Sequence, residues 1–412
     1  MRASSAVSVP VSKDLLIIIN TAAFLRSFTF GLTGVVLGIY LFRAGLSSFN
    51  IGVVVAAGLV GSALATIGVT AKADRAGRRR TLVVLSLLGG IGALALAFTP
   101  AVPVLLVMAF VGMLNGTGTD RSAAFTLEQA IIPGLVPDAS RTWGLAWYNV
   151  VLDTAGSLGA LAAALPLLLQ HWLALPLLTS YRAVFLGCAF LGVVGAVLYR
   201  FASAAVEVSK SATEALPHHI SPATKKVITK LAGLFSLDAF GGGFLTDALV
   251  AYWFFRRFGV AEESLGVLFF AMHLLNAASH LGAAWLARRI GLVNTMVFTH
   301  LPSSLFLIAA AFVPSVKWAV LLFLYREALV EMDVPTRQSY VAAVVLPREP
   351  TFARGITNLA RNVFWAVGSS VAGFLMQNVA FSAPLVIGGG AKISYDLLLY
   401  RAFRKLRPPE EH

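Results

Sequence analysis

The sequence predicts an all-α integral membrane protein with twelve transmembrane helices, and three observations support this fold class. Of its 412 residues, 58% are hydrophobic and only 12% are charged, whereas a soluble domain usually has about 25% charged residues. Apolar stretches recur that reach the roughly 20 residues a helix needs to cross the hydrocarbon core. The basic residues gather in alternate connections between these stretches. A chain with this pattern places most of its surface against lipid.

The apolar stretches fall into two groups of six, separated by the polar segment 203–226. This arrangement predicts an N-terminal bundle (1–202), a cytoplasmic linker (203–226) and a C-terminal bundle (227–412). The polar N-terminus leads into the first stretch without an A-x-A-like cleavage site, so that stretch is expected to be retained as a helix. The predicted spans lie near 14–42, 50–70, 81–100, 102–127, 143–168, 182–201, 228–256, 264–286, 293–313, 315–334, 352–376 and 382–403.

The distribution of Lys and Arg predicts the orientation. With a cytoplasmic N-terminus, 22 of the 32 Lys and Arg residues fall on the cytoplasmic side and five fall outside. This bias follows the positive-inside rule and places both termini in the cytoplasm. The net charge of +13 is then explained mainly by this orientation, and the basic residues on the cytoplasmic side also attract anionic lipid. We therefore expect a multi-pass protein of the cell (plasma) membrane, with membrane lipid as a partner and no nucleic acid.

The chain also shows an internal repeat. Ala97-Phe98-Thr99-Pro100 closes the third stretch, and Ala311-Phe312-Val313-Pro314 closes the ninth, 214 positions later. Further matches occur at similar offsets in both halves. Parallel six-helix repeats place a substrate site near the middle of the membrane, between the halves.

One connection carries a recognisable motif. Between the second and third stretches stands Ala73-Asp74-Arg75-Ala76-Gly77-Arg78-Arg79-Arg80. It resembles the cytoplasmic signature G-x-L-A-D-R-x-G-R-R of the major facilitator superfamily of transporters, with its D-R-x-G-R-R core intact. Thr70 and Lys72 depart from the pattern, and the second copy keeps only Arg289 and Gly291. The alternative interpretation is a solvated basic loop that follows the positive-inside rule.

The resemblance implies that this loop is a cytoplasmic latch made of Asp74, Arg75, Gly77, Arg78 and Glu128. Asp74 would lie at the start of helix 11, where an anion at a helix N-terminus contributes about 0.3–1 kcal/mol. Arg78 would pair with an acidic residue low on helix 4, for which Glu128 is the candidate. Contacts of this strength open and close readily, as alternating access requires.

Polar and charged residues inside the predicted spans are the candidate site. A charge at mid-bilayer costs roughly 2.5–3.5 kcal/mol, so each needs a partner or a wet cavity. Structural ion pairs are one interpretation and a cavity lining is the other. The resemblance implies that helices 1, 4, 7 and 10 line the cavity. The predicted substrate and coupling-ion residues are Arg26, Asn115, Asp120, Arg121, Asn149, Asp153, Asp238, Asp247, Glu331, Asp333, Asn358 and Arg361.

Three further patterns lie within the spans. Lys392 and Asp396 are four residues apart, and we interpret them as a self-satisfied structural pair. Gly241-Gly242-Gly243 predicts a bend or a close-packing site. His273, Asn276 and His280 share one helix face, which predicts a polar cavity face; a metal site would need more ligands. We expect no metal and no cofactor.

These observations predict a secondary active transporter that moves a small polar or ionic solute by rocker-switch alternating access, coupled to protons. Arg26 and Arg361 would attract an anionic group, and Asp120 or Asp238 would carry the proton. Symport and antiport both stay open, and a monomer is expected. A multidrug/proton antiporter of the same fold is an alternative, although the run 156–160 lacks the proline of that group's helix 5 motif. A lipid-modifying intramembrane enzyme is the alternative from another class; we expect no enzyme.

Overall fold

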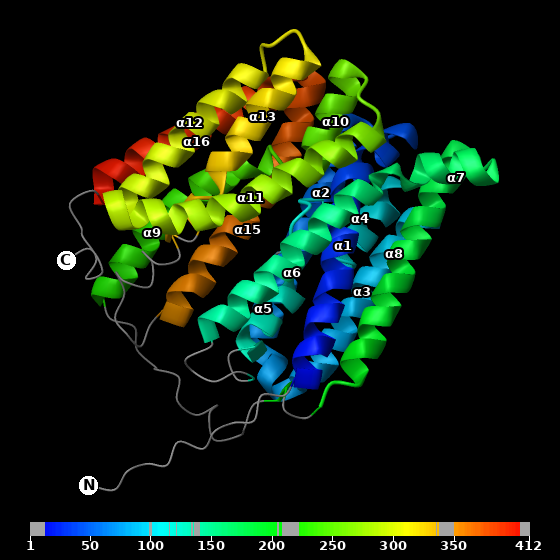
Figure 1. The fold of residues 1–412 in the computed structure, drawn as a ribbon, viewed down its shortest axis with the longest axis horizontal. Coiled ribbons are helices and arrows are strands. Elements are labelled where there is room, and N and C mark those ends of the chain that lie inside the picture. The colour runs from blue at the N-terminus through cyan, green and yellow to red at the C-terminus, as the bar shows by residue number, and fades with distance from the viewer. Residues whose placement is uncertain are drawn as a thin grey trace, which may run out of the picture.

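The computed structural model describes residues 13–98, 101–114, 116–120, 122–132, 135, 141–203, 206–207, 222–334, 336–337 and 350–403. Within these ranges the regular structure is helical, as the composition predicts. Figure 1 shows long helices arranged in two groups, one for each half of the chain.

Within the described ranges, eight helical segments are long and apolar enough to cross a membrane: Asp14–Arg43, Ser48–Val69, Arg78–Phe98, Trp147–Leu173, Leu177–Arg200, Lys226–Phe258, Glu262–Ala287 and Leu292–Ala310. The other four predicted spans are not among these eight segments, for reasons of length or composition. The stretch 102–127 is not one helix, and the helix Val316–Val330 is short. The last two predicted spans form long helices that are less apolar, because they contain charged residues together with other polar ones. Twelve spans therefore stay a prediction.

The first half of the chain contains α1 (Lys13–Arg43), α2 (Ser48–Ala76), α3 (Arg78–Phe98), α4 (Val102–Val111), α5 (Ala123–Ile131), α6 (Arg141–Leu161), the 3-10 turn η3 (Ala162–Ala164), α7 (Leu165–Leu173) and α8 (Leu177–Arg200). α1 packs against α6 and α8, and α3 packs against α8. Small residues permit the close approach, as membrane helix interfaces require. A Cβ on Gly192 of α8 would lie 2.9 Å from the Cα of Gly90 on α3.

The second half contains α9 (Pro222–Gly243), α10 (Asp247–Phe258), α11 (Glu262–Ile290), α12 (Leu292–Ala310), α13 (Val316–Val330), α15 (Pro350–Asn378) and α16 (Ala383–Phe403). α9 packs against α15 and α16, and α12 packs against α13 and α16. These helices position the charged residues described below.

Two helix breaks meet near the centre of the molecule. α4 ends at Val111, and the irregular segment before α5 includes Met113 and Gly118 with φ of 50° and 73°. α9 ends at Gly243, where the glycine triplet predicted a bend. The Ala248 amide at the start of α10 donates to the Gly116 carbonyl at 3.0 Å. Irregular backbone inside a membrane protein is tolerated where it is buried in protein or lines a cavity.

The two halves are joined at one end of the molecule, which we call the paired end. Here the Tyr252 and Ser48 hydroxyls lie 2.9 Å apart, and the Phe49 amide donates to Gln377 Oε1 at 3.1 Å. Arg43 Nη2 lies 2.5 Å from Glu262 Oε1. Figure 1 shows the halves meeting around α2 and α10 and diverging toward α5 and the start of α15. The paired end carries the connections that are predicted to lie outside the cell.

Candidate functional site

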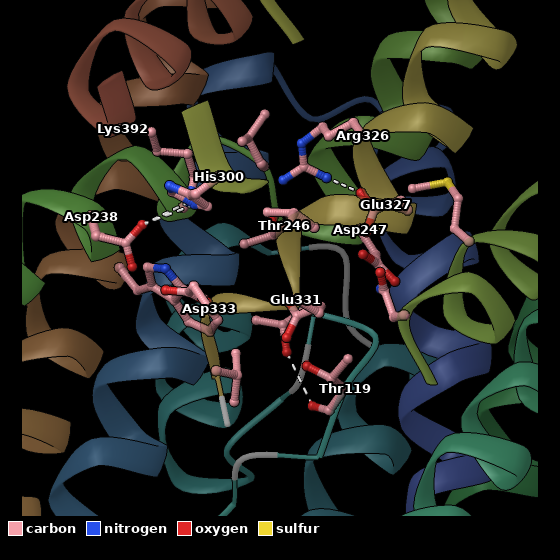
Figure 2. A pocket seen from close by; sticks show the side chains of 18 of the residues that line it. Thr119, Asp238, Thr246, Asp247, His300, Arg326, Glu327, Glu331, Asp333 and Lys392 are labelled. Atoms are coloured by element: carbon pink, nitrogen blue, oxygen red, sulfur yellow. Dashed lines mark hydrogen bonds and ion pairs between the residues drawn. The ribbon is translucent and has the colours of Figure 1, made fainter. Parts of the chain in front are cut away.

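A cavity lies at the helix breaks (Figure 2). Its empty space, counted out to its mouth, is about 770 Å³. Its lining is strongly polar, and most of it comes from the second half of the chain. The lining residues are Thr117, Thr119, Asp238, Gly242, Leu245, Thr246, Asp247, Met272, His273, Asn276, His300, Arg326, Glu327, Val330, Glu331, Asp333, Val334, Arg361, Trp365 and Lys392.

Asp238 of α9 is the centre of one wall. Its carboxylate lies 2.8 Å from Lys392 Nζ and 3.1 Å from Arg361 Nη1. Arg337 Nη1 and His300 Nε2 lie farther away, at 3.6 and 3.7 Å. Asp238 is 3% exposed. A buried carboxylate is stable only with such partners, so four elements of the second half are tied to this one residue.

The neighbours of Asp238 complete a balanced network, which we call the Asp238 network. Asp333 accepts from Arg337 at 2.6 Å, and His300 Nδ1 lies 2.9 Å from Asp396 Oδ1. The network contains three carboxylates (Asp238, Asp333, Asp396), three permanent cations (Arg337, Arg361, Lys392) and His300. The interpretation of Lys392 and Asp396 as a pair is therefore wrong. Each side chain finds a nearer partner on a neighbouring helix.

The opposite wall is formed by α10, α11 and α13, and Figure 2 shows Asp247, Glu327 and Arg326 together there. Asp247 Oδ2 lies 2.9 Å from His273 Nε2. Arg326 donates to the carboxylate of Glu327, the next residue on α13. His273 and Asn276 come from the helix face that was predicted to line a cavity. We call this side of the cavity the Asp247 wall.

Two polar atoms at the Asp247 wall have no hydrogen-bond partner. They are Thr246 Oγ1 and Asn276 Oδ1, and both atoms are buried. Thr246 as a residue is only 4% exposed. A buried polar atom left unpaired costs about 1–3 kcal/mol. Since both residues line the cavity, a bound molecule is a natural partner for these atoms.

Arg26 of α1 forms a separate cluster that does not line this cavity. Arg26 Nε lies 2.8 Å from Asp120 Oδ2, and Arg26 Nη2 lies 2.5 Å from Glu128 Oε2. The hydroxyls of Tyr148 and Tyr199 also donate to Glu128, which is fully buried. The predicted pairing of Glu128 with Arg78 needs correction, because the hydrogen bonds of Glu128 are made with Arg26 and the two tyrosines. The cluster ties α1, α5, α6 and α8 together.

The signature loop forms a tight turn between α2 and α3. Gly77 has φ of 96° and caps α2, and a side chain is strained in that conformation. Glu207 accepts from the backbone amides of Arg78 and Arg79 at 2.7 and 3.3 Å. Arg75 is exposed. An acidic side chain thus sits at the N-terminus of α3, where the helix dipole favours it.

The remaining predicted site residues are placed as follows. Asn149 is exposed on α6, and Asp153 is half-buried within electrostatic range of His273, His280 and Glu331. Asn115 and Arg121 lie outside the described residues, and the structure describes only the backbone of Asp74 and Asn358. Of the predicted set, Asp238, Asp247, Glu331, Asp333 and Arg361 come together at the cavity.

Sequence reasoning missed four charged or titratable residues of the cavity: His300, Arg326, Glu327 and Lys392. Each stands inside a predicted apolar span, which was the available signal. Among the described residues, no group of three or more His, Cys, Asp or Glu side chains is arranged to bind a metal ion. The chemistry that the cavity offers is charge pairing, hydrogen bonding and proton transfer.

The chain is similar to known membrane proteins. The family model of the Major Facilitator Superfamily matches residues 19–330. An uncharacterized membrane protein of Saccharomyces cerevisiae is 27% identical over 409 residues, covering 92% of this chain and 91% of the yeast protein. The crystal structure of the nucleoside transporter NupG shares the fold with a TM-score of 0.74 and 14% identity, covering 94% of this chain and 100% of that one. The xylose transporter XylE from E. coli, in an inward open conformation, has a TM-score of 0.71 and 14% identity, covering 94% and 96%.

Proposed function

Since the chain belongs to the major facilitator superfamily, we propose that it is a secondary active transporter that moves a small polar or ionic solute, coupled to protons. The observation that carries this proposal is the polar cavity at the meeting point of two broken helices. Its lining combines paired charges with unpaired polar atoms, and it lies where parallel repeats place a substrate site. The fold is that of known transporters, which favours transport over an intramembrane enzyme.

Alternating access would follow from the arrangement of the two halves. The bundles 1–202 and 227–412, joined by the linker 203–226, would rock about the cavity. The ion pair Arg43–Glu262 and the contact of Tyr252 with Ser48 hold the paired end together. Breaking these contacts and forming others at the opposite end would expose the cavity to the other side. With both termini in the cytoplasm, as we propose, this arrangement would be an inward-facing state of a monomer in the plasma membrane.

Asp238 is the better of the two candidate proton carriers. It lines the cavity, whereas Asp120 is bonded to Arg26 and Ser122 and is not part of the lining. Proton binding at Asp238 would weaken its attraction for Lys392 and Arg361 and so rearrange the wall of the cavity. A proton and a solute that act on the same network influence each other, which is what coupling requires.

The test is transport by the purified protein in liposomes. A panel of labelled solutes that includes amines, carboxylates, sugars, nucleosides and hydrophobic cations would be offered with and without a pH gradient, beside protein-free liposomes. We expect at least one solute to accumulate under the gradient and to lose that accumulation when a protonophore is added. The hydrophobic cations test the multidrug/proton antiporter alternative. If folded protein exchanges no solute of the panel in either direction, the proposed function is wrong.

A further inference from the structure

We infer that the group of the solute recognised at the Asp247 wall is a protonated amine, so that the transported class is organic cations. This inference rests on the proposed function and names its substrate class. It departs from the sequence-based expectation that Arg26 and Arg361 attract an anionic group. Three independent features of the cavity support it: the distribution of charge, the unpaired acceptors, and an adjoining apolar pocket.

The charges of the cavity are unevenly distributed. In the Asp238 network, three carboxylates face three permanent cations, so that wall is neutral when His300 is neutral. Over the described residues that line the whole cavity, five carboxylates (Asp238, Asp247, Glu327, Glu331 and Asp333) face three permanent cations (Arg326, Arg361 and Lys392). Counting His273 and His300 as neutral, this lining has a net charge of −2. Buried charge needs compensation, and a cationic solute together with the coupling proton proposed for Asp238 would balance the lining as a whole.

The cations of the cavity are already engaged. Lys392 and Arg361 contact Asp238, and Arg326 donates to Glu327. An anionic solute would have to displace one of these carboxylates while facing the negative Asp247 wall. A cationic solute would share the Asp247 carboxylate with His273 and would not face that repulsion. The electrostatics of the cavity therefore favour a cation over an anion.

The two unpaired atoms of the cavity lining also favour a cationic solute. Asn276 Oδ1 accepts hydrogen bonds, and Thr246 Oγ1 can accept them through its lone pairs. Thr246 precedes Asp247 directly, and Asn276 lies three residues after His273 on α11, so both residues line the cavity from the segments that carry the Asp247–His273 pair. An ammonium group has three donors and no acceptor. It can therefore satisfy a carboxylate, an amide oxygen and a hydroxyl at once.

A smaller pocket adjoins the cavity through the shared residues Thr117 and Trp365. Much of its lining is apolar, with Phe30, Leu59, Met113 and Leu114, and it has room for only a small group, about the size of a methyl. A small apolar substituent of the solute would enter it while the amine faces Asp247. Trp365, which lines both spaces, offers an aromatic face that attracts cations. The structure thus favours an amine attached to an apolar or aromatic body.

Binding of three probes of similar shape tests the charge requirement. Phenethylamine, 2-phenylethanol and 3-phenylpropanoate carry a cationic, a neutral and an anionic group on the same ring. Binding to the purified full chain in detergent would be measured by calorimetry and by the shift of the melting temperature. Alkyl amines, diamines and quaternary ammonium ions would be added to cover other cation shapes. We expect amines to bind, the alcohol to bind weakly and the carboxylate to show no binding.

Substitutions test whether the amine binds at the Asp247 wall. Asp247→Asn should weaken amine binding roughly tenfold to a hundredfold, as expected for the loss of a charged hydrogen bond. Thr246→Val keeps the shape and should weaken binding severalfold. Glu263→Gln, at an exposed position of α11, is the control and should bind normally. Melting temperatures of the free variants show that each is folded, so a loss of binding reports on the site.

Transport separates failure of this inference from failure of the proposed function. If the carboxylate or the alcohol binds as well as the amine, or if no cation of the set binds, the inference is wrong. It is also wrong if Asp247→Asn and Thr246→Val both leave amine binding unchanged. Counterflow of an anionic or neutral solute in the liposome panel would leave the transporter proposal standing. Absence of exchange for every solute would contradict the transporter proposal itself.

Discussion

Arg43 at the end of α1 and Glu262 at the start of α11 form an ion pair with a nitrogen–oxygen distance of 2.5 Å, and it joins the two halves of the chain. Tyr181 of α8 donates to the same Glu262 carboxylate at 2.5 Å. The Arg43 guanidinium also lies 5.1 Å from the ring centroid of Phe255 and 5.6 Å from that of Tyr181. Glu262 is 2% exposed. A pair this well shielded from water holds the paired end closed more effectively than an exposed one.

Loss of this pair should therefore open the paired end. Glu262→Gln removes a charged hydrogen bond worth about 1.5–3 kcal/mol, which corresponds to a shift of tenfold or more between conformations. Spin labels at Ala44→Cys and Val379→Cys, in a Cys188→Ser background, would report the distance across this end. We expect a larger population at long distance in Glu262→Gln and an unchanged distribution in the exposed neighbour Glu263→Gln. Identical distributions in the two variants would contradict a gating role.

The second prediction concerns Asp238 as the proton carrier. Asp238→Asn should abolish accumulation driven by a pH gradient but leave solute exchange at equal pH on both sides. Because the change leaves Lys392 without its carboxylate, the companion variant Asp238→Asn with Lys392→Gln restores charge balance and guards against misfolding. Asp120→Asn is the counterpart and should impair both modes together through instability. Full pH-driven accumulation in both Asp238 variants would show that another group carries the proton.

The Arg26 cluster is expected to act mainly on stability. Arg26→Gln leaves Glu128 buried without its cation, which costs about 3–5 kcal/mol. Tyr148→Phe removes a single hydrogen bond to Glu128 and should cost about 1–3 kcal/mol. Arg26→Gln with Glu128→Gln should recover part of the loss, since Glu128 is then no longer a buried charge without its cation, while Asp120 still lacks Arg26. Thermal unfolding in detergent measures all three. If Arg26→Gln melts like the wild type while solute binding disappears, the cluster is a binding site and not a structural one.

The fourth prediction concerns the signature loop. Glu207→Gln should weaken the cap on α3, because the charge of the carboxylate favours the helix N-terminus by about 0.3–1 kcal/mol. Faster hydrogen–deuterium exchange is expected in the peptide that covers residues 77–82. Glu214→Gln, which is the same substitution at a nearby position of the sequence, is the control. If this loop is also the latch, Asp74→Asn should slow transport more than it changes solute binding. Normal transport by this variant would show that Asp74 is a charge in the loop without a role in the latch.

The predicted orientation can be tested with single cysteines. In a Cys188→Ser background, cysteines at Ser4, Ser211 and His412 should resist a membrane-impermeant thiol reagent applied to intact cells. A cysteine at the exposed Lys317, at the end of α13 that is predicted to face outward, should react with it. Permeabilised cells show that the first three sites are reactive when reached. Labelling of any one of them from outside would overturn the topology.

Much of the architecture follows from local properties of the sequence. Length and hydropathy of a segment decide whether it can cross a membrane, and Lys and Arg counts in connections decide the preferred orientation, so neither requires knowledge of contacts. The glycine triplet 241–243 predicted the end of α9 because glycine weakens a helix wherever it stands. Asp238, Asp247, Glu331, Asp333 and Arg361 were found because charge inside an apolar span needs a partner or a cavity.

Only the tertiary structure decided which of these charges meet. Lys392 and Asp396 are near enough on one helix to pair, yet the rotation of α16 against α9 and α12 brings Lys392 to Asp238 and Asp396 to His300. Glu128 lies with Arg26 because α1 and α5 bury both side chains in one cluster. By composition, the stretch 102–127 could have been one helix. In the structure, the irregular segment between α4 and α5 instead packs against the start of α10, where the Ala248 amide donates to the Gly116 carbonyl. Pairings of this kind depend on the rotation and depth of helices far apart in sequence, which hydropathy and spacing do not contain.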